Sequence, residues 1–120
     1  MGLAMVAGGS LIVTTAAIHI HLWAAGYNEV PTLGGLFLAQ GIGGLVLGPL
    51  IVALRRWYLA LVGAVYMAAS AGGLILSATV GFVGIHDGLG VPWASTALAV
   101  ELSGFVVLGA VGLGSVVRRR

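Results

Sequence analysis

Four long apolar segments take up almost all of this 120-residue chain, and they limit its fold more than any other feature. Hydrophobic residues make up 60% of the sequence and charged residues 7%, whereas roughly 25% of a soluble domain is charged. A bilayer must therefore be the solvent. Because a membrane-spanning helix needs about 20 apolar residues, the sequence predicts an all-α membrane protein. We expect one domain over residues 1–120, folded as an up-down bundle of four transmembrane helices.

Short polar or glycine-rich segments set the predicted boundaries of these helices. A turn around Pro31 follows the first span, and Arg55-Arg56 ends the second. A glycine-rich loop, 85–91, precedes the fourth, and we expect Thr32 to cap the second helix. The first apolar run lacks a basic leader and exceeds the length of a signal-peptide core, so we expect it to be kept as a span. The predicted spans are residues 3–26, 33–54, 57–84 and 92–117.

The arginines predict how the bundle is oriented. They form two clusters, Arg55-Arg56 and Arg118–Arg120, which lie on one side of the membrane if there are four spans. The positive-inside rule assigns that side, and with it both termini, to the cytoplasm of the cell membrane. Because helix topology already explains these basic residues, we expect the lipid bilayer but no nucleic acid as a partner. Aromatic residues fall near the two predicted interfaces: Trp23, Tyr27 and Trp93 outside, Trp57 and Tyr58 inside.

Small residues indicate close helix packing. The chain contains 21 glycines, and helices in a membrane associate through close contact rather than through hydrophobicity. Three small-xxx-small pairs are candidate contact surfaces: Gly44 and Gly48, Ala68 and Gly72, Ala110 and Gly114. The sequence therefore predicts a tightly packed bundle.

The chain also contains a weak internal repeat. Val30-Pro31 precedes Gln40 by the same spacing as Val91-Pro92 precedes Glu101. The same offset pairs Gly43 with Gly104, Leu47 with Leu108 and Gly48 with Gly109. We interpret this pattern as a possible parallel repeat of two hairpins, although apolar sequences also align by chance.

Glu101 is the one acid within a predicted span. A carboxylate in hydrocarbon costs roughly 2.5–3.5 kcal/mol on insertion scales, and such groups usually face a protein interior. At 1.5 Å per residue, His19, Gln40 and Glu101 each lie ~9–14 Å below the outer end of their helices. Tyr66, Ser70 and Ser77 share one face of the third helix, with Ser77 at the same depth. The predicted binding pocket consists of Glu101, His19, Gln40, Ser77, Ser70 and Tyr66.

These polar residues are compatible with more than one role. They can form a hydrogen-bond network that fixes helix register, or a proton relay or cation site centred on Glu101. A metal site of His19, His86 and Glu101 is a further possibility, because two histidines and a carboxylate bind zinc or iron. Nothing in the sequence indicates a catalytic residue or a specific cofactor.

Several stretches carry a resemblance to a known group of proteins. They are His19-Ile20-His21-Leu22-Trp23, Gly26-Tyr27, Val30-Pro31-Thr32 and Leu36-Phe37-Leu38 with Gln40. Together with the late acid Glu101, they resemble a family of small four-helix integral membrane proteins of actinobacteria. The resemblance implies the fold and a bacterial source, but no mechanism.

We expect a small integral membrane protein, without enzymatic activity, that works as an oligomer or as an accessory subunit of a membrane complex. Small size and the lack of room for a soluble domain favour this function. The alternative is a proton-coupled or cation-binding carrier that uses Glu101 and His19. A second alternative is a membrane redox, quinone- or haem-binding protein that uses His19, Trp23 and Tyr27.

Overall fold

The computed structural model describes residues 2–79, 81 and 93–118, and it is helical and without strands over them. Each of the four long helices is long and apolar enough to cross a membrane. The predicted all-helical fold and its four apolar helices are confirmed. The helices are α1 (Gly2–Ala25), α2 (Leu33–Leu54), α3 (Trp57–Thr79) and α4 (Ala94–Arg118), with a short 3-10 helix, η1 (Tyr27–Glu29), between the first two.

The end of α3 differs from the predicted boundary. The sequence predicted a span over 57–84, but α3 ends at Thr79. Gly81 has a φ of 95°, and its N–H donates to the carbonyl of Leu76 at 2.7 Å. A left-handed glycine of this kind terminates a helix, because it turns the chain while satisfying a free carbonyl. The predicted start of the fourth span, Pro92, lies outside the described residues.

Thr32 does not cap α2, so that expectation was wrong. Its φ is 67°, and its side chain makes no capping hydrogen bond. Instead, the N–H of Leu33 donates to the Pro31 carbonyl at 2.7 Å, and the N–H of Gly34 donates to the Val30 carbonyl at 2.9 Å. The backbone of the turn therefore satisfies the first amides of α2.

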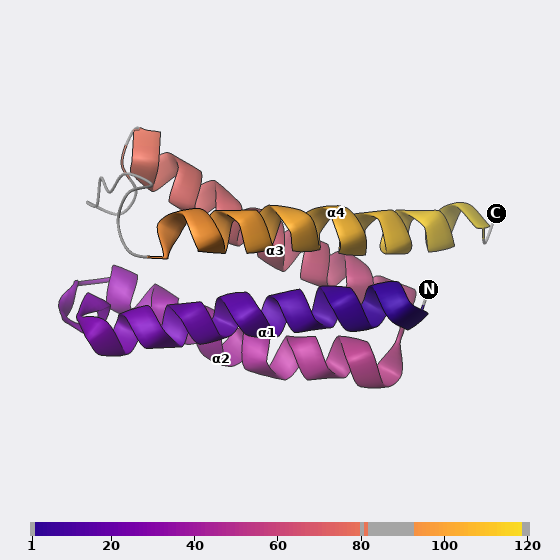
Figure 1. Cartoon of the computed structure of the whole chain (residues 1–120), viewed down its shortest axis with the longest axis horizontal. Coiled ribbons are helices and arrows are strands. Elements are labelled where there is room, and N and C mark those ends of the chain that lie inside the picture. Colours follow the sequence, from indigo (N-terminus) through magenta and orange to yellow (C-terminus); the bar gives the residue numbers. More distant parts are fainter. Residues whose placement is uncertain (1, 80, 82–92, 119–120) are drawn as a thin grey trace.

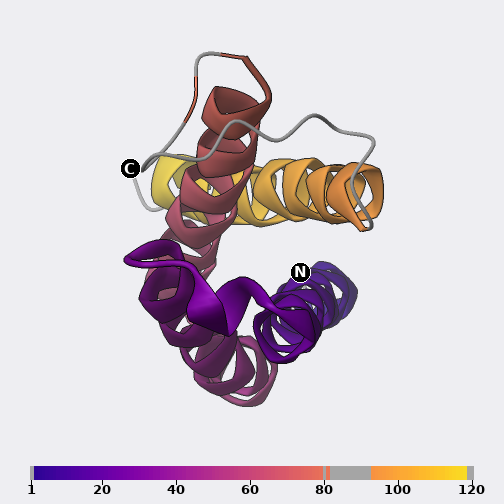
Figure 2. The same ribbon diagram turned by 90° about the vertical axis from the view of Figure 1, so that its left-hand side faces the viewer.

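Successive helices run in opposite directions, and both chain ends lie at one end of the bundle (Figure 1). α1 packs mainly against α2 and α4, and α3 packs mainly against α4. Arg55, in a left-handed conformation, and Arg56 join α2 to α3. From this tight turn α2 and α3 separate toward the opposite end, so that α3 leans away from the first pair of helices (Figures 1 and 2).

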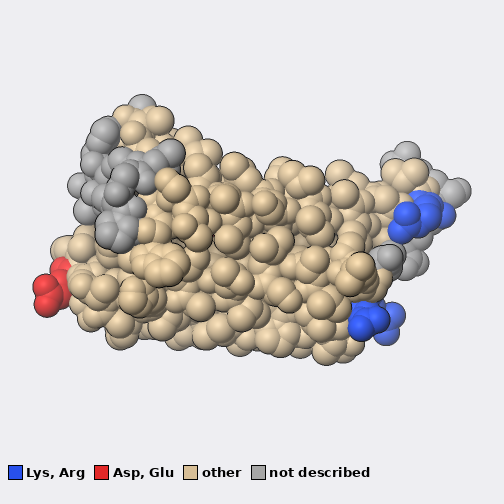
Figure 3. All heavy atoms as spheres, in the orientation of Figure 1, with Lys and Arg blue, Asp and Glu red and all other residues tan. Residues whose placement is uncertain are grey.

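Charged groups lie at the two ends of the bundle. Arginine side chains gather at the end that holds both termini, and an acidic side chain marks the other end (Figure 3). We call these the arginine end, formed by Arg55, Arg56 and Arg118, and the Glu29 end, where η1 lies. The surface between them carries no charged side chain in this view.

The hydrophobic core fills the half of the bundle toward the arginine end. Met5 and Ile12 near the start of α1 meet Ile51 near the end of α2, together with Met67 and Leu108 from the middle of α3 and α4. All five side chains are fully buried. The Glu29 half lacks an equivalent cluster among the described residues, and the candidate site lies there.

One of the three predicted small-residue pairs forms a helix contact. Gly48 packs against α1, where an added Cβ would lie 2.8 Å from the carbonyl oxygen of Gly9, and Gly44 packs against Ala16. By contrast, Ala68 is exposed, and a Cβ at Gly72 would meet nothing within 4 Å. Ala110 is likewise exposed. The α1–α2 contact is therefore the close backbone approach that glycine permits.

The internal repeat stays a prediction. Paired positions differ in their surroundings, because Gly104 is buried against Met67 whereas Gly43 is exposed and an added Cβ there would meet nothing within 4 Å.

The Gly9–Gly48 contact predicts opposite effects for two glycine-to-alanine substitutions. Gly48→Ala should destabilise the fold by about 1–3 kcal/mol, because its Cβ would press on backbone that cannot move aside. Gly72→Ala should stabilise the fold by up to about 1 kcal/mol, because alanine favours the helix and a Cβ at this position has open space. Unfolding by denaturing detergent, followed by circular dichroism, measures both. Equal effects of the two substitutions would contradict the packing described for Gly48.

Candidate functional site

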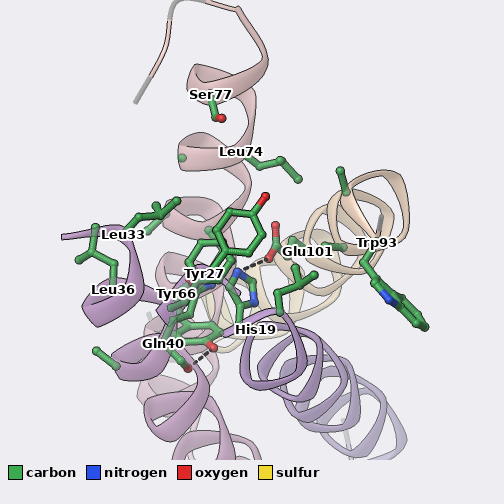
Figure 4. Close-up of a pocket in the computed structure, with 18 of the residues that line it drawn as sticks. His19, Tyr27, Leu33, Leu36, Gln40, Tyr66, Leu74, Ser77, Trp93 and Glu101 are labelled. Carbon is green, nitrogen blue, oxygen red and sulfur yellow. Dashed lines mark hydrogen bonds and ion pairs between the residues drawn. The ribbon is translucent and has the colours of Figure 1, made fainter. Parts of the chain in front are cut away.

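A cavity of about 490 Å³ lies in the Glu29 half of the bundle, and all four helices and η1 contribute to its wall (Figure 4). The structure brings together every side chain of the predicted pocket around this cavity. That these residues bind a ligand stays a prediction. The six are Glu101, His19, Gln40, Ser77, Ser70 and Tyr66.

Glu101 faces inward because of its register on α4. The buried residues of this helix follow helical spacing, with Ala97, Glu101, Gly104 and Leu108 on one stripe. Such a stripe is the face that a helix turns toward its neighbours. The side chain of Glu101 lies at the cavity, and the residue is only 1% exposed.

Thr15 and His19, one helical turn apart on α1, meet the carboxyl group of Glu101. The Thr15 hydroxyl donates to Oε2 at 2.7 Å. His19 Nε2 lies 4.0 Å from the same oxygen (Figure 4). His19 Nδ1 lies 2.7 Å from the Thr15 carbonyl oxygen. A carbonyl can only accept, so Nδ1 carries a hydrogen and Nε2 of the neutral ring presents a lone pair. A proton that moves between the carboxyl group of Glu101 and the imidazole ring of His19 would therefore travel only a short distance.

Two buried polar atoms of residues that line the cavity have no hydrogen-bond partner among the described residues. They are Oε1 of Glu101 and Nε2 of Gln40. Among the described residues, the Gln40 side chain therefore does not donate to the polar network that the sequence suggested. Leaving a buried polar atom unpaired costs about 1–3 kcal/mol, so such atoms call for an explanation. Here both belong to residues that line one cavity, where a ligand or water can satisfy them.

The other predicted residues have partners within the protein. The Tyr66 hydroxyl donates to the backbone carbonyl of Gln40 at 2.6 Å, which ties α3 to α2. Ser70 donates to the Tyr66 carbonyl at 3.1 Å, within its own helix. Ser77 is buried and lines the cavity. Tyr66 and Ser70 therefore serve mainly to hold the wall in place.

Aromatic rings form a part of the wall that the sequence analysis did not assign to the pocket. The centroid of the Phe37 ring lies 5.0 Å from that of the His19 ring and 4.8 Å from that of the Tyr27 ring. Trp93 also lines the cavity, whereas Trp23 does not. The sequence could have indicated that Phe37 lines the pocket, because it stands three residues before Gln40 and so lies on the same face of α2.

The predicted metal site of His19, His86 and Glu101 stays a prediction. His86 lies outside the described residues, and the described histidines and acids form no group of three that could hold a metal ion. His21 is exposed, and its ring meets Trp93 at 5.8 Å. In the described part of the chain, His19 is the one histidine at the cavity wall. These residues would therefore provide a haem with a single axial imidazole ligand.

Comparisons with protein-family models, with curated proteins and with solved structures found no match. The resemblance to small membrane proteins of actinobacteria therefore stays a prediction, and the candidate site is interpreted from its own geometry.

The hydrogen bond from Thr15 predicts a graded response to substitution. Thr15→Val keeps the shape but removes the donor, which leaves both oxygens of Glu101 unpaired and should cost about 1–3 kcal/mol of stability. Thr15→Ser keeps a hydroxyl and should cost less. Detergent-induced unfolding of the two variants measures the difference. A valine variant as stable as the serine variant would show that this hydrogen bond does not support the fold.

Proposed function

We propose that this chain is an integral membrane protein whose cavity binds a cation in exchange for the proton of Glu101. Four helices of spanning length support membrane insertion. The positive-inside rule assigns the arginine end to the cytoplasm, which leaves the cavity in the outer half of the membrane. This is the carrier function that stood as the alternative in the sequence analysis.

The buried carboxyl group of Glu101, with one oxygen free at a cavity wall, carries this proposal. An ionised carboxylate in an apolar site is costly unless a positive charge pairs with it, and otherwise such a group takes up a proton. Oε2 already accepts from Thr15, while Oε1 has no partner. A cation at Oε1 would balance the negative charge of the ionised carboxylate. The cation would thus take the place of the proton.

His19 gives the leaving proton a route. Its Nε2 is 4.0 Å from Glu101 Oε2, within reach through a small side-chain shift or one water. Thr15 on α1 also faces the carboxyl, and Gln40 on α2 and Tyr66 on α3 line the same cavity. Of these groups, the imidazole is the one suited to pass protons near neutral pH.

The cavity favours binding over the accessory or oligomeric role that size alone suggested. A network that only fixes helix register satisfies its own donors and acceptors. Here Glu101 Oε1 and Gln40 Nε2 stay unpaired beside about 490 Å³ of space. That volume lies within the range of small-molecule sites, roughly 300–1,000 Å³.

Topology is tested by single cysteines, because the natural chain contains none. A cysteine at Asn28, exposed in η1, should react with a membrane-impermeant thiol reagent on intact cells. A cysteine at Arg118 should react only after the cells are opened, because positive charge is retained inside. The reverse labelling pattern would contradict the proposed orientation.

Cation binding should release a proton from Glu101. Tetraphenylphosphonium and tetramethylammonium carry no dissociable proton, so any proton released comes from the protein. Addition of a bound cation to purified protein in weak buffer should release about one proton per site, because one charge replaces another. A pH-indicator dye measures the release. Glu101→Gln should release none, whereas Glu29→Gln, which alters an exposed acid in η1, should behave like the natural protein. Release that persists in Glu101→Gln, or no release with either cation, would refute the function.

A further inference from the structure

Part of the cavity wall is also part of the outer surface of the bundle. Leu36, Ala39 and Gly43 on α2 line the cavity and are exposed, and so is Ala69 on α3. They are more exposed than the other residues of α2 and α3 that line the cavity, so they mark the edge of its wall. The mouth of the cavity therefore includes the gap between α2 and α3, on the side of the bundle rather than only at its Glu29 end.

Small side chains keep this mouth open. Three of its four residues are glycine or alanine, and an added Cβ at Gly43 would meet nothing within 4 Å. The contacts between α2 and α3 run from Ile51 against Gly63 to the hydrogen bond of Tyr66 with Gln40. The two helices diverge from the arginine end toward the Glu29 end (Figures 1 and 2). Both helices have the length and composition of membrane spans, so this gap would face lipid and not water.

The lining chemistry selects among cations. Hydrated inorganic ions such as Ca²⁺ or Mg²⁺ require several oxygen ligands, whereas Glu101 is the one described carboxylate at this wall. Leucines, alanines and aromatic residues, among them Tyr27, Phe37 and Trp93, make up most of the other lining residues. Aromatic faces attract organic cations, and leucines accommodate their apolar groups. A single carboxylate balances one positive charge.

We propose that the cation is a lipophilic, singly charged organic molecule that reaches Glu101 sideways from the membrane, through the gap between α2 and α3. The inference rests on the proposed function, and it adds the class of ligand and its route. The apolar body of the ligand would occupy the cavity between the aromatic rings and the leucines. Its charged centre would lie on the side of Oε1 of Glu101, the oxygen that has no partner among the described residues.

Two glycines of α2 provide a matched test of the route. Gly43 and Gly35 are both exposed, and a Cβ at either would meet nothing within 4 Å, but only Gly43 lines the cavity. In proteoliposomes, Gly43→Leu should slow tetraphenylphosphonium association by about tenfold or more, because leucine fills the gap. Gly35→Leu should leave the rate unchanged. Thermal unfolding should show that both variants are folded, since an added Cβ at either position has open space. Equal rates in the two variants would overturn the lateral route.

The size of the cation tests the ligand class separately. Tetraphenylphosphonium, which partitions into lipid, should bind with Glu101-dependent proton release, and tetramethylammonium, which does not, should bind at least about tenfold more weakly because it fills little of the apolar wall. If both bind equally and both need Glu101, the proposed function stands and this inference fails. If neither cation releases a proton from the natural protein, both the function and the inference fail.

Discussion

The hydrogen bond between Thr15 and Glu101 is the interaction on which the arrangement of the bundle depends most. It joins α1 to α4 at 2.7 Å and is buried. Because lipid tails are as apolar as leucine, hydrophobicity alone does not bring apolar helices together in a membrane. In the membrane protein that we propose, a buried acid changes that balance, because turning Glu101 toward lipid would expose a polar group to hydrocarbon. The acid thus fixes the rotation of α4, and Thr15 gives it a partner on α1.

One half of the bundle contains most of the close packing, and the other half contains the candidate binding site. In the arginine half, Gly9 and Gly48 bring α1 and α2 into backbone contact, and fully buried side chains such as Met5 and Leu108 fill the space between helices. In the Glu29 half, α3 leans away and leaves a cavity. The closely packed arginine half therefore holds most of the hydrophobic core, and the cavity lies in the other half. Tyr66 lies at the border, since its hydroxyl ties α3 to α2 at Gln40.

Site chemistry and membrane energetics support the same proposal. A lone carboxyl group in an apolar pocket costs little free energy when it holds a proton and is neutral. The ionised form costs little only when another cation is bound beside it. His19, with Nδ1 committed to the Thr15 carbonyl, leaves Nε2 to face the acid. Under this proposal, the aromatic rings of η1 and α2 would attract the organic cation. Each of these features lies on a different element, so the site exists only in the assembled bundle.

Much of the architecture could be predicted from the sequence because it depends on the length and composition of segments. The four apolar runs predict the helices, and the bounds of α2 agree with residues 33–54. Polar residues at matched depth predict which side chains can meet, and Glu101, His19 and Gln40 do line one cavity. Depth along a helix follows directly from counting residues, since each adds about 1.5 Å.

The rotation and tilt of the helices were decided only by the tertiary structure. A helix that is apolar on every side has no amphipathic pattern to show which face is inward, because lipid and protein interior are equally apolar to it. The sequence therefore did not show that Gly44 and Gly48 pack against α1 while Gly72 meets open space. Nor did it show that the Gln40 side chain is left without a partner. The lean of α3, which opens the cavity, results from the packing of whole helices, and no local pattern in the chain encodes it.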